Sequence, residues 1–136
     1  MEEGRGLALL AGRMNATATR AEAVPALAPH AHALRNALKR VSEATQAAWS
    51  TGVPHDALAN AVPYMQAFGH TVLAWIWLEV ALASLEKGAT QSIAACEGRV
   101  RATAYFYHYE LPKIEAWLNV MERRDMTCAE MPEDAF

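Results

Sequence analysis

The sequence contains few cysteines and no residues with the spacing of a metal site. Its two cysteines, Cys96 and Cys128, lie far apart, so they form neither a CxxC motif nor a disulfide framework. No His-Glu-x-x-His motif is present, and no glutamate has a histidine three residues later, as di-iron bundles require. We therefore predict no metal site in this chain, and reduced thiols in a cytoplasmic protein.

Catalytic and phosphate-binding signatures are also missing. The chain has no Walker loop, no Gly-x-Gly-x-x-Gly and no Gly-x-Ser-x-Gly, and the single pair of close glycines, Gly4 and Gly6, is too short a motif to bind a nucleotide. The sequence therefore predicts no catalytic residue and no cofactor-binding residue in this chain.

Basic residues are too few for a nucleic-acid-binding protein. The chain has 12 lysines and arginines against 15 acidic residues, a formal net charge of −3. Phosphate binding needs a basic surplus, so we do not expect nucleic acid as a partner. The chain starts with an acidic Met-Glu-Glu, which is not typical of a secretory signal.

Long apolar runs are scarce as well. The most apolar stretch, residues 71–85, carries Glu79 and falls short of the ~18–20 uninterrupted apolar residues of a membrane span. We therefore predict a soluble protein with no membrane span, in which this stretch is a core helix.

Strand signals are weak throughout, because β-branched residues are scattered and no segment alternates cleanly between apolar and polar residues. The hydrophobic content of 53% is ample for a core, and much of it is alanine, a strong helix former. The predicted fold class is all-α: an antiparallel, up-down bundle of three to four long helices over residues 1–124. Residues 125–136 are mostly polar and predict an extended tail.

Four helices are expected from apolar residues at spacings of three and four: residues 3–22, 29–49, 54–87 and 91–124. Gly52 suits the left-handed position after the second helix. Two prolines fall inside the later helices, and we expect a kink or short break at Pro63 and a bend at Pro112. The core stripe of the fourth helix is predicted to be Ile93, Val100, Tyr107, Leu111, Ile114, Leu118 and Met121.

The third helix is apolar on every side over most of residues 72–85. Such a helix is expected to be surrounded by protein, either at the centre of the bundle or at a subunit boundary. Glu79 lies within this stretch and must find a partner, for which Arg99 or Arg101 is plausible. Gly69 indicates a position where another group approaches the helix closely.

The five histidines have different environments. His30 and His32 are two residues apart, point in different directions on a helix and are expected to be solvated, as is His55. His70 is expected in the core or at an interface, bonded to a backbone carbonyl or a tyrosine, although a ligand contact stays possible.

Aromatic residues gather in two phrases of the sequence, and surplus aromatics suggest a contact surface. Packing is the ordinary role of such residues, and gripping a ligand is the alternative. The residues that we select as a candidate interface or ligand cluster are Tyr64, Phe68, Gly69, His70, Trp75, Trp77, Tyr105, Tyr107 and His108.

The two phrases are residues 60–78, NAVPYMQAFGHTVLAWIWL, and residues 102–112, ATAYFYHYELP. Their order and separation resemble the C-terminal domain that follows the flavin-binding core in one branch of the acyl-CoA dehydrogenases, which includes enzymes like methylmercaptopropionyl-CoA dehydrogenase. The resemblance covers nearly the whole chain, from about Gly6 to Phe136.

The resemblance implies a role within a larger enzyme. Members of the family oxidise acyl-CoA to enoyl-CoA, a reaction of fatty acid metabolism, and pass a hydride to FAD. Their catalytic glutamate and flavin contacts lie in the upstream core, and no residue here matches them. The resemblance thus implies a non-catalytic packing domain whose partners are the flavin-binding core and further copies in a homo-oligomer. A free-standing dimerisation module and a small-ligand-binding bundle are the alternatives.

Overall fold

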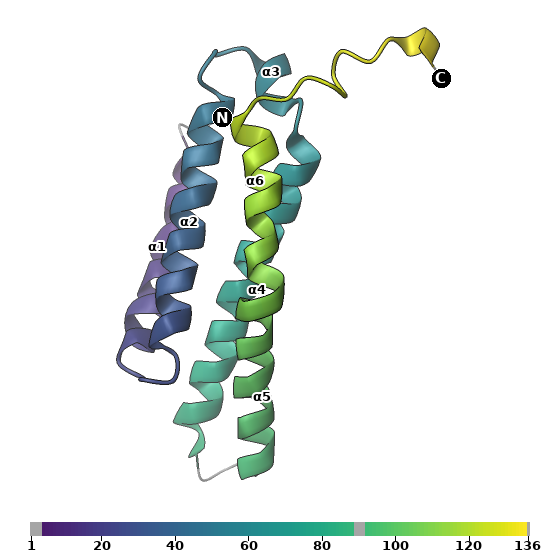
Figure 1. Cartoon of the computed structure of the whole chain (residues 1–136). Coiled ribbons are helices and arrows are strands. Elements are labelled where there is room, and N and C mark those ends of the chain that lie inside the picture. Colours follow the sequence, from purple (N-terminus) through teal and green to yellow (C-terminus); the bar gives the residue numbers. More distant parts are fainter. Residues whose placement is uncertain (1–3, 89–91, 136) are drawn as a thin grey trace.

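The computed structural model describes residues 4–88 and 92–135 of the chain. Within these residues the elements are α1 (Arg5–Glu22), α2 (Ala28–Ala48), α3 (Pro54–Leu58), α4 (Ala61–Glu86), α5 (Ile93–Tyr105) and α6 (Ile114–Glu122), and no strand is found. The predicted all-α, up-down bundle is confirmed. Figure 1 shows the α1–α2 hairpin beside a second hairpin, in which α4 packs antiparallel to the continuous line of α5 and α6.

The first two helices form as their patterns predict. Met14, Ala18 and Ala21 of α1 are buried, together with Ala31 and Leu34 of α2. Pro29 lies in the first turn of α2, where its missing N–H leaves no bond unmade. Beyond α2, Gly52 has a φ of +70°, the left-handed conformation that glycine adopts without strain.

The third predicted helix, residues 54–87, is interrupted earlier than expected. Its first part is the short α3, and the chain turns at Ala59 and Asn60 before α4 begins. Pro63 therefore lies in the first turn of α4, where the N–H groups have no partner within the helix. The proline costs α4 no hydrogen bond at this position, and the break precedes it.

The fourth predicted helix, residues 91–124, changes its winding before Pro112. The π-helix η2 (Phe106–Glu110) follows α5, and the 3-10 helix η3 (Leu111–Lys113) leads into α6. The N–H of Leu111 donates to the carbonyl of Phe106, five residues back. Since Pro112 has no N–H to donate to the carbonyl of His108, the ordinary ladder is lost here, and the wider turn accommodates the bend.

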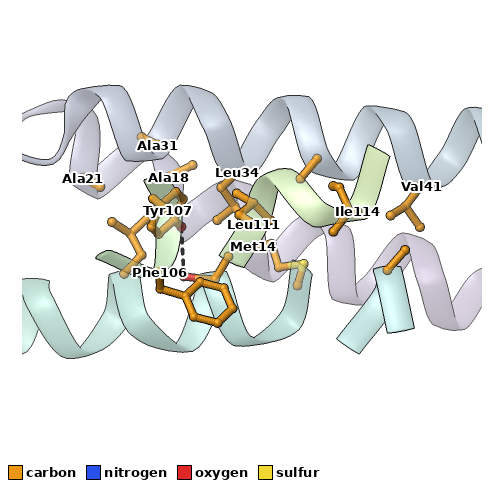
Figure 2. Close-up of a cluster of buried hydrophobic side chains, with 14 of the residues drawn as sticks. Met14, Ala18, Ala21, Ala31, Leu34, Val41, Phe106, Tyr107, Leu111 and Ile114 are labelled. Atoms are coloured by element: carbon orange, nitrogen blue, oxygen red, sulfur yellow. Dashed lines mark hydrogen bonds between the residues drawn. The ribbon is translucent and has the colours of Figure 1, made fainter. Parts of the chain in front are cut away.

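The core lies where α1, α2, α4 and α6 meet, with η2 and η3 closing one side. Figure 2 shows Met14, Leu34, Val41, Leu111 and Ile114 directed into this space. The predicted core stripe of the fourth helix holds from Tyr107 to Met121. Its first member, Ile93, is 86% exposed and is a wrong assignment, because α5 packs mainly against α4 alone.

A cluster of one arginine, Arg40, and two carboxylates joins α2 to α6. The Arg40 guanidinium donates from Nε to Glu115 Oε2 over 3.0 Å and also pairs with Glu122. These carboxylates raise the pKa of Arg40, Glu122 first. The cluster fixes the register of the two helices along one side of the bundle.

Residues beyond α6 run away from the bundle past α3 (Figure 1). Asn60 donates from Nδ2 to the carbonyl of Asp125 over 2.8 Å, which ties the beginning of this segment to the α3–α4 turn. The short 3-10 helix η4 (Glu133–Ala135) follows at the end, and its residues are exposed.

By length and composition α4 is the one helix in the described part of the chain that is apolar enough to cross a membrane. The expected absence of a membrane span therefore stays a prediction. One face of α4 packs on the bundle, and the other is uncovered, as described below.

Candidate functional site

The nine residues predicted to form one cluster are distributed over several places in the bundle. Tyr64 and Phe68 stack on each other on α4, with ring centroids 6.0 Å apart. Tyr107 is buried, whereas Tyr105 is 56% exposed. The structure therefore divides the predicted cluster into packing residues and surface residues.

Tyr107 and His108 belong to η2 and meet His30 from α2. The rings of His30 and Tyr107 are stacked with centroids 4.7 Å apart, and the His108 ring lies 5.7 Å from His30 at a steep angle. Tyr107 donates its hydroxyl proton to the carbonyl of Ala74 over 2.8 Å (Figure 2). The prediction that His30 is solvated is wrong, since it is only 7% exposed.

Burial controls the ionisation of this group. Loss of water contact lowers the pKa of His30, and the nearby His108 lowers it further. Burial also raises the pKa of the Tyr107 hydroxyl. Both side chains are therefore neutral near pH 7 and serve as packing with a satisfied hydrogen bond.

His70 of α4 faces a carboxylate of η2. Its Nε2 lies 3.5 Å from Oε2 of Glu110, and its ring meets the edge of Trp117 at 4.8 Å. The expected partner, a backbone carbonyl or a tyrosine, is thus wrong. Lys113 donates to the same oxygen of Glu110 over 2.8 Å and, ahead of His70, lowers the pKa of that carboxyl. Glu110 is therefore a paired anion.

Glu79 is paired across to α1, not to α5. Thr17 donates its hydroxyl to Glu79 Oε1 over 2.6 Å, and Arg20 donates to the same oxygen over 3.2 Å. Trp75 in turn donates its indole N–H to the Thr17 hydroxyl over 2.7 Å. The prediction of Arg99 or Arg101 as the partner is wrong, and the pairing makes Glu79 a structural link between helices.

Surface grooves lie away from the predicted cluster. One of about 430 Å³ runs between α1 and α4 and is lined by Arg20, Val24, Leu82 and Leu85 among others. Another, of about 370 Å³, is lined by Ala61, Val62, Met65 and Gln66 at the beginning of α4. In the described ranges no three metal-ligating side chains come together.

The feature that the sequence pattern did not reveal is an uncovered apolar face on α4. We call it the α4 outer stripe, and it consists of Val62, Met65, Gln66, Gly69, Leu73, Ile76, Val80 and Ala83. Val62 is 71% exposed, Leu73 45% and Ile76 47%. The expectation of a helix at the centre of the bundle is wrong for this face, and the alternative of a subunit boundary stays a prediction.

Gly69 lies within this stripe, and the close approach predicted at Gly69 stays a prediction for a group outside the chain. Apart from its chain neighbours and the backbone of its own helix, a Cβ at Gly69 would meet no described atom of this chain within 4 Å. The predicted close approach is therefore absent inside the chain. Val62, Gly69, Ile76 and Ala83 recur every seven residues, but the other faces of α4 are also apolar, so this spacing does not single out the stripe.

The four tryptophans do not create the exposed surface. Trp49, Trp75, Trp77 and Trp117 are all partly buried, and the last three pack against the core. Among the described residues, the large hydrophobic side chains that are exposed are mainly aliphatic, with Tyr105 and Tyr109 as the aromatic exceptions, stacked at 4.9 Å.

Comparison with known protein families finds a family to which this helical domain belongs. The family model described as "Acetyl-CoA dehydrogenase C-terminal like" matches residues 10–132. Neither a search of curated proteins nor a search of solved structures gave a match. The match spans the bundle from α1 through α6 and enters the segment beyond it. The chain therefore belongs to the acyl-CoA dehydrogenase C-terminal domain family, the non-catalytic helical domains of such enzymes.

Proposed function

We propose that this chain serves as a packing and assembly domain of a flavin-dependent acyl-CoA dehydrogenase of the methylmercaptopropionyl-CoA dehydrogenase-like branch. The parent enzyme would oxidise acyl-CoA to enoyl-CoA with FAD. The observation that carries the proposal is the family match over residues 10–132, from α1 to beyond α6. The domain itself adds contact surface to that enzyme.

The chemistry of the side chains supports an auxiliary role. The candidate acids and bases are engaged: Glu79 by Thr17 and Arg20, and Glu110 by Lys113 and His70. A general base acts on a substrate proton within hydrogen-bonding reach, and these carboxylates instead hold helices together.

The face of α5 and η2 is the surface that we propose for contact with the flavin-binding core. Tyr109 is 65% exposed and stacks on Tyr105, and Ile93 extends the apolar character along α5. Among the described residues of α5 itself, Thr103 alone is buried. Tyrosine is enriched at protein interfaces because it combines a large apolar ring with a polar edge.

The proposal is tested with the flavin-binding core to which this domain is joined or beside which it is encoded. The core alone and the core with the chain are compared by light scattering, flavin absorbance and acyl-CoA oxidation. We expect the chain to bind the core, and a Tyr105→Ser/Tyr109→Ser variant to bind at least tenfold more weakly. Leu9→Ser, at a 73% exposed position of α1, is the matched control. A core indifferent to the chain in mass, flavin retention and activity overturns the proposal.

A second measurement separates the alternatives. The chain alone is titrated with FAD and with acyl-CoA, and we expect no binding and no yellow colour. Saturable binding of either ligand at the His70 and Tyr107 region would instead favour a ligand-binding bundle. Self-association without any affinity for the core would favour a free-standing dimerisation module, an alternative that the exposed α4 outer stripe supports.

A further inference from the structure

The α4 outer stripe is long, apolar and free of charge. It extends from Val62 to Ala83, about 32 Å at the rise of an α-helix. Gln66 is its one strongly polar member, and the nearest acidic residue on the helix, Glu79, turns aside to pair with Arg20. Water contacts this surface in the single chain, so a partner that covers it gains hydrophobic stabilisation.

The spacing along the stripe is that of helix-to-helix packing. Val62, Gln66, Gly69, Leu73, Ile76, Val80 and Ala83 alternate in steps of four and three residues. This alternation keeps one seam of a helix facing a neighbouring helix over its whole length. The partner that fits is therefore another long helix lying along α4.

Gly69 lies in the middle of this seam and has no explanation within the chain. Glycine inside a helix is less favourable than alanine, because it loses more conformational freedom on folding. Apart from its chain neighbours and the backbone of its own helix, no described atom of the chain lies within 4 Å of the position that a Cβ would occupy. A helix backbone or a large side chain from outside, packed closely at this point, supplies the missing reason for a small residue.

We propose that the α4 outer stripe binds the same stripe of a second copy. The two helices are antiparallel, and the twofold axis passes through the stripe at the height of Thr71 along the helix. This assignment rests on the self-assembly part of the proposed function, for which it names the surface. A twofold arrangement brings one surface patch against itself, so a single seam suffices for a closed dimer.

Complementary sizes favour the antiparallel pairing. With the axis near Thr71, Gly69 of one copy faces Leu73 of the other, Gln66 faces Ile76, and Val62 faces Val80. Each leucine then fills the gap beside a glycine. A parallel pairing would instead place glycine against glycine and leave a void, which close-packed interfaces avoid.

The area of the seam indicates how strongly the two copies should bind each other. A strip about 32 Å long and about 12 Å wide covers roughly 400 Å² on each copy, or about 800 Å² in total, before α1 and α5 side chains add to it. Specific interfaces of this size are weak and reversible. We therefore expect a dimer that dissociates on dilution.

A membrane surface is a poorer occupant for the same face. Helices that lie on membranes carry lysines and arginines beside their apolar face. The charges beside the stripe include Glu79 and Glu86, both paired with Arg20 of α1. Phospholipid vesicles are accordingly included as an arm of the test.

The first experiment measures the mass of the whole chain by analytical ultracentrifugation from about 1 µM to about 1 mM. The wild type should pass from monomer to dimer, and Ile76→Glu should stay monomeric, with a dissociation constant raised at least tenfold. Leu58→Glu, at a 60% exposed position on α3, is the control and should dimerise normally. Circular dichroism verifies that each variant is folded.

A second variant gives two effects in opposite directions. Gly69→Gln places a good helix former on the seam without adding apolar surface, so the thermal midpoint of the monomer should rise by a few degrees. The same change should weaken the dimer at least tenfold, because the new side chain meets Leu73 of the second copy. A purely structural role for Gly69 would not lower dimerisation while raising stability.

Cross-linking tests the direction of the helices. In a Cys96→Ser/Cys128→Ser background, Val62→Cys with Val80→Cys should give disulfide dimers, because these positions face each other in the antiparallel arrangement. Val62→Cys alone should not, since the two copies of residue 62 lie about 27 Å apart. Efficient cross-linking of Val62→Cys alone would overturn the antiparallel geometry.

The possible outcomes distinguish an error about the seam from an error about self-assembly. A wild type that stays monomeric throughout overturns self-assembly and the seam together. A dimer that Ile76→Glu and Gly69→Gln leave unchanged overturns only the seam. Binding of the wild type, but not Ile76→Glu, to vesicles of phosphatidylcholine and phosphatidylglycerol without dimerisation would assign the stripe to a lipid surface instead.

Discussion

Burial of His30 against Tyr107 makes the stability of the domain depend on pH. The pKa of His30 is lowered below 6.5 in the folded chain, first by loss of water contact. Below about pH 6.5 the unfolded chain binds a proton that the folded chain excludes. The free energy of unfolding therefore decreases as the pH is lowered. The loss stops growing once the pH is below the folded pKa.

A His30→Phe variant should remove this dependence. The phenyl ring keeps the stacking on Tyr107 and cannot titrate. Between about pH 7.5 and about pH 5.5 we expect the wild type to lose up to roughly 1 kcal/mol more stability than His30→Phe, by urea denaturation. His32→Gln, altered at an exposed site on the same helix, should keep the wild-type dependence. An identical pH profile for wild type and His30→Phe would contradict the assignment.

Thr17 of α1 joins two side chains of α4 at the α1–α4 contact. It accepts from Trp75 and donates to Glu79, and it is 3% exposed. Thr17→Val keeps the shape but leaves the indole N–H without its acceptor, so we expect a loss of about 1–3 kcal/mol in the free energy of unfolding. Tryptophan fluorescence should also change. The control, Thr19→Val at an exposed site, should cost less, and a loss equal to that of Thr17→Val would argue against the network.

At the scale of the elements, the α2–α6 contact depends on the geometry of one guanidinium. Arg40 reaches Glu115 and Glu122, two turns apart on α6, and Glu43 on its own helix, with its side chain 25% exposed. Arg40→Lys keeps the charge but loses the planar fork, so we expect stability to fall by about 1 kcal/mol. Lys39→Arg, at a 75% exposed side chain, should be neutral. Equal effects for the two variants in urea denaturation would show that charge alone is sufficient.

The π-helix is the element whose winding follows from a single residue. Pro112 lacks the backbone N–H that would continue the helix, and the chain forms a wider turn over Phe106–Glu110. This turn places Tyr107 in the core and Glu110 beside His70. An unbroken α-helix would rotate the preceding residues to other positions. The bend at Pro112 was predictable from the sequence, but the form that it takes was not.

At the scale of the whole molecule, stability should reside in the bundle and not in the segment beyond α6. Leu118 is 0% exposed where α6 meets α2 and α4, so Leu118→Ala should cost about 2–5 kcal/mol. Truncation after Met126 removes mostly exposed residues and keeps the Asn60–Asp125 bond, so it should cost less than about 1 kcal/mol. Thermal and urea unfolding compare the two. A truncation as costly as Leu118→Ala would show that the tail is part of the fold.

The sequence by itself determined the all-helical fold, the approximate bounds of α1 and α2 and the core stripe along α6. These follow from local causes: apolar residues at spacings of three and four, a glycine at Gly52 and prolines at helix beginnings and bends. The two aromatic phrases also indicated the family, which the match over residues 10–132 bears out.

Only the tertiary structure decided which face of α4 is left uncovered, which arginine pairs with Glu79 and that His30 is buried. A helix that is apolar on every side carries no mark of its inner face, because that face is chosen by the helices that pack against it. Arg20 and Glu79 are 59 residues apart in sequence and meet only when α1 lies against α4. His30 is buried because η2 turns Tyr107 onto it, a contact between distant segments that no local pattern encodes.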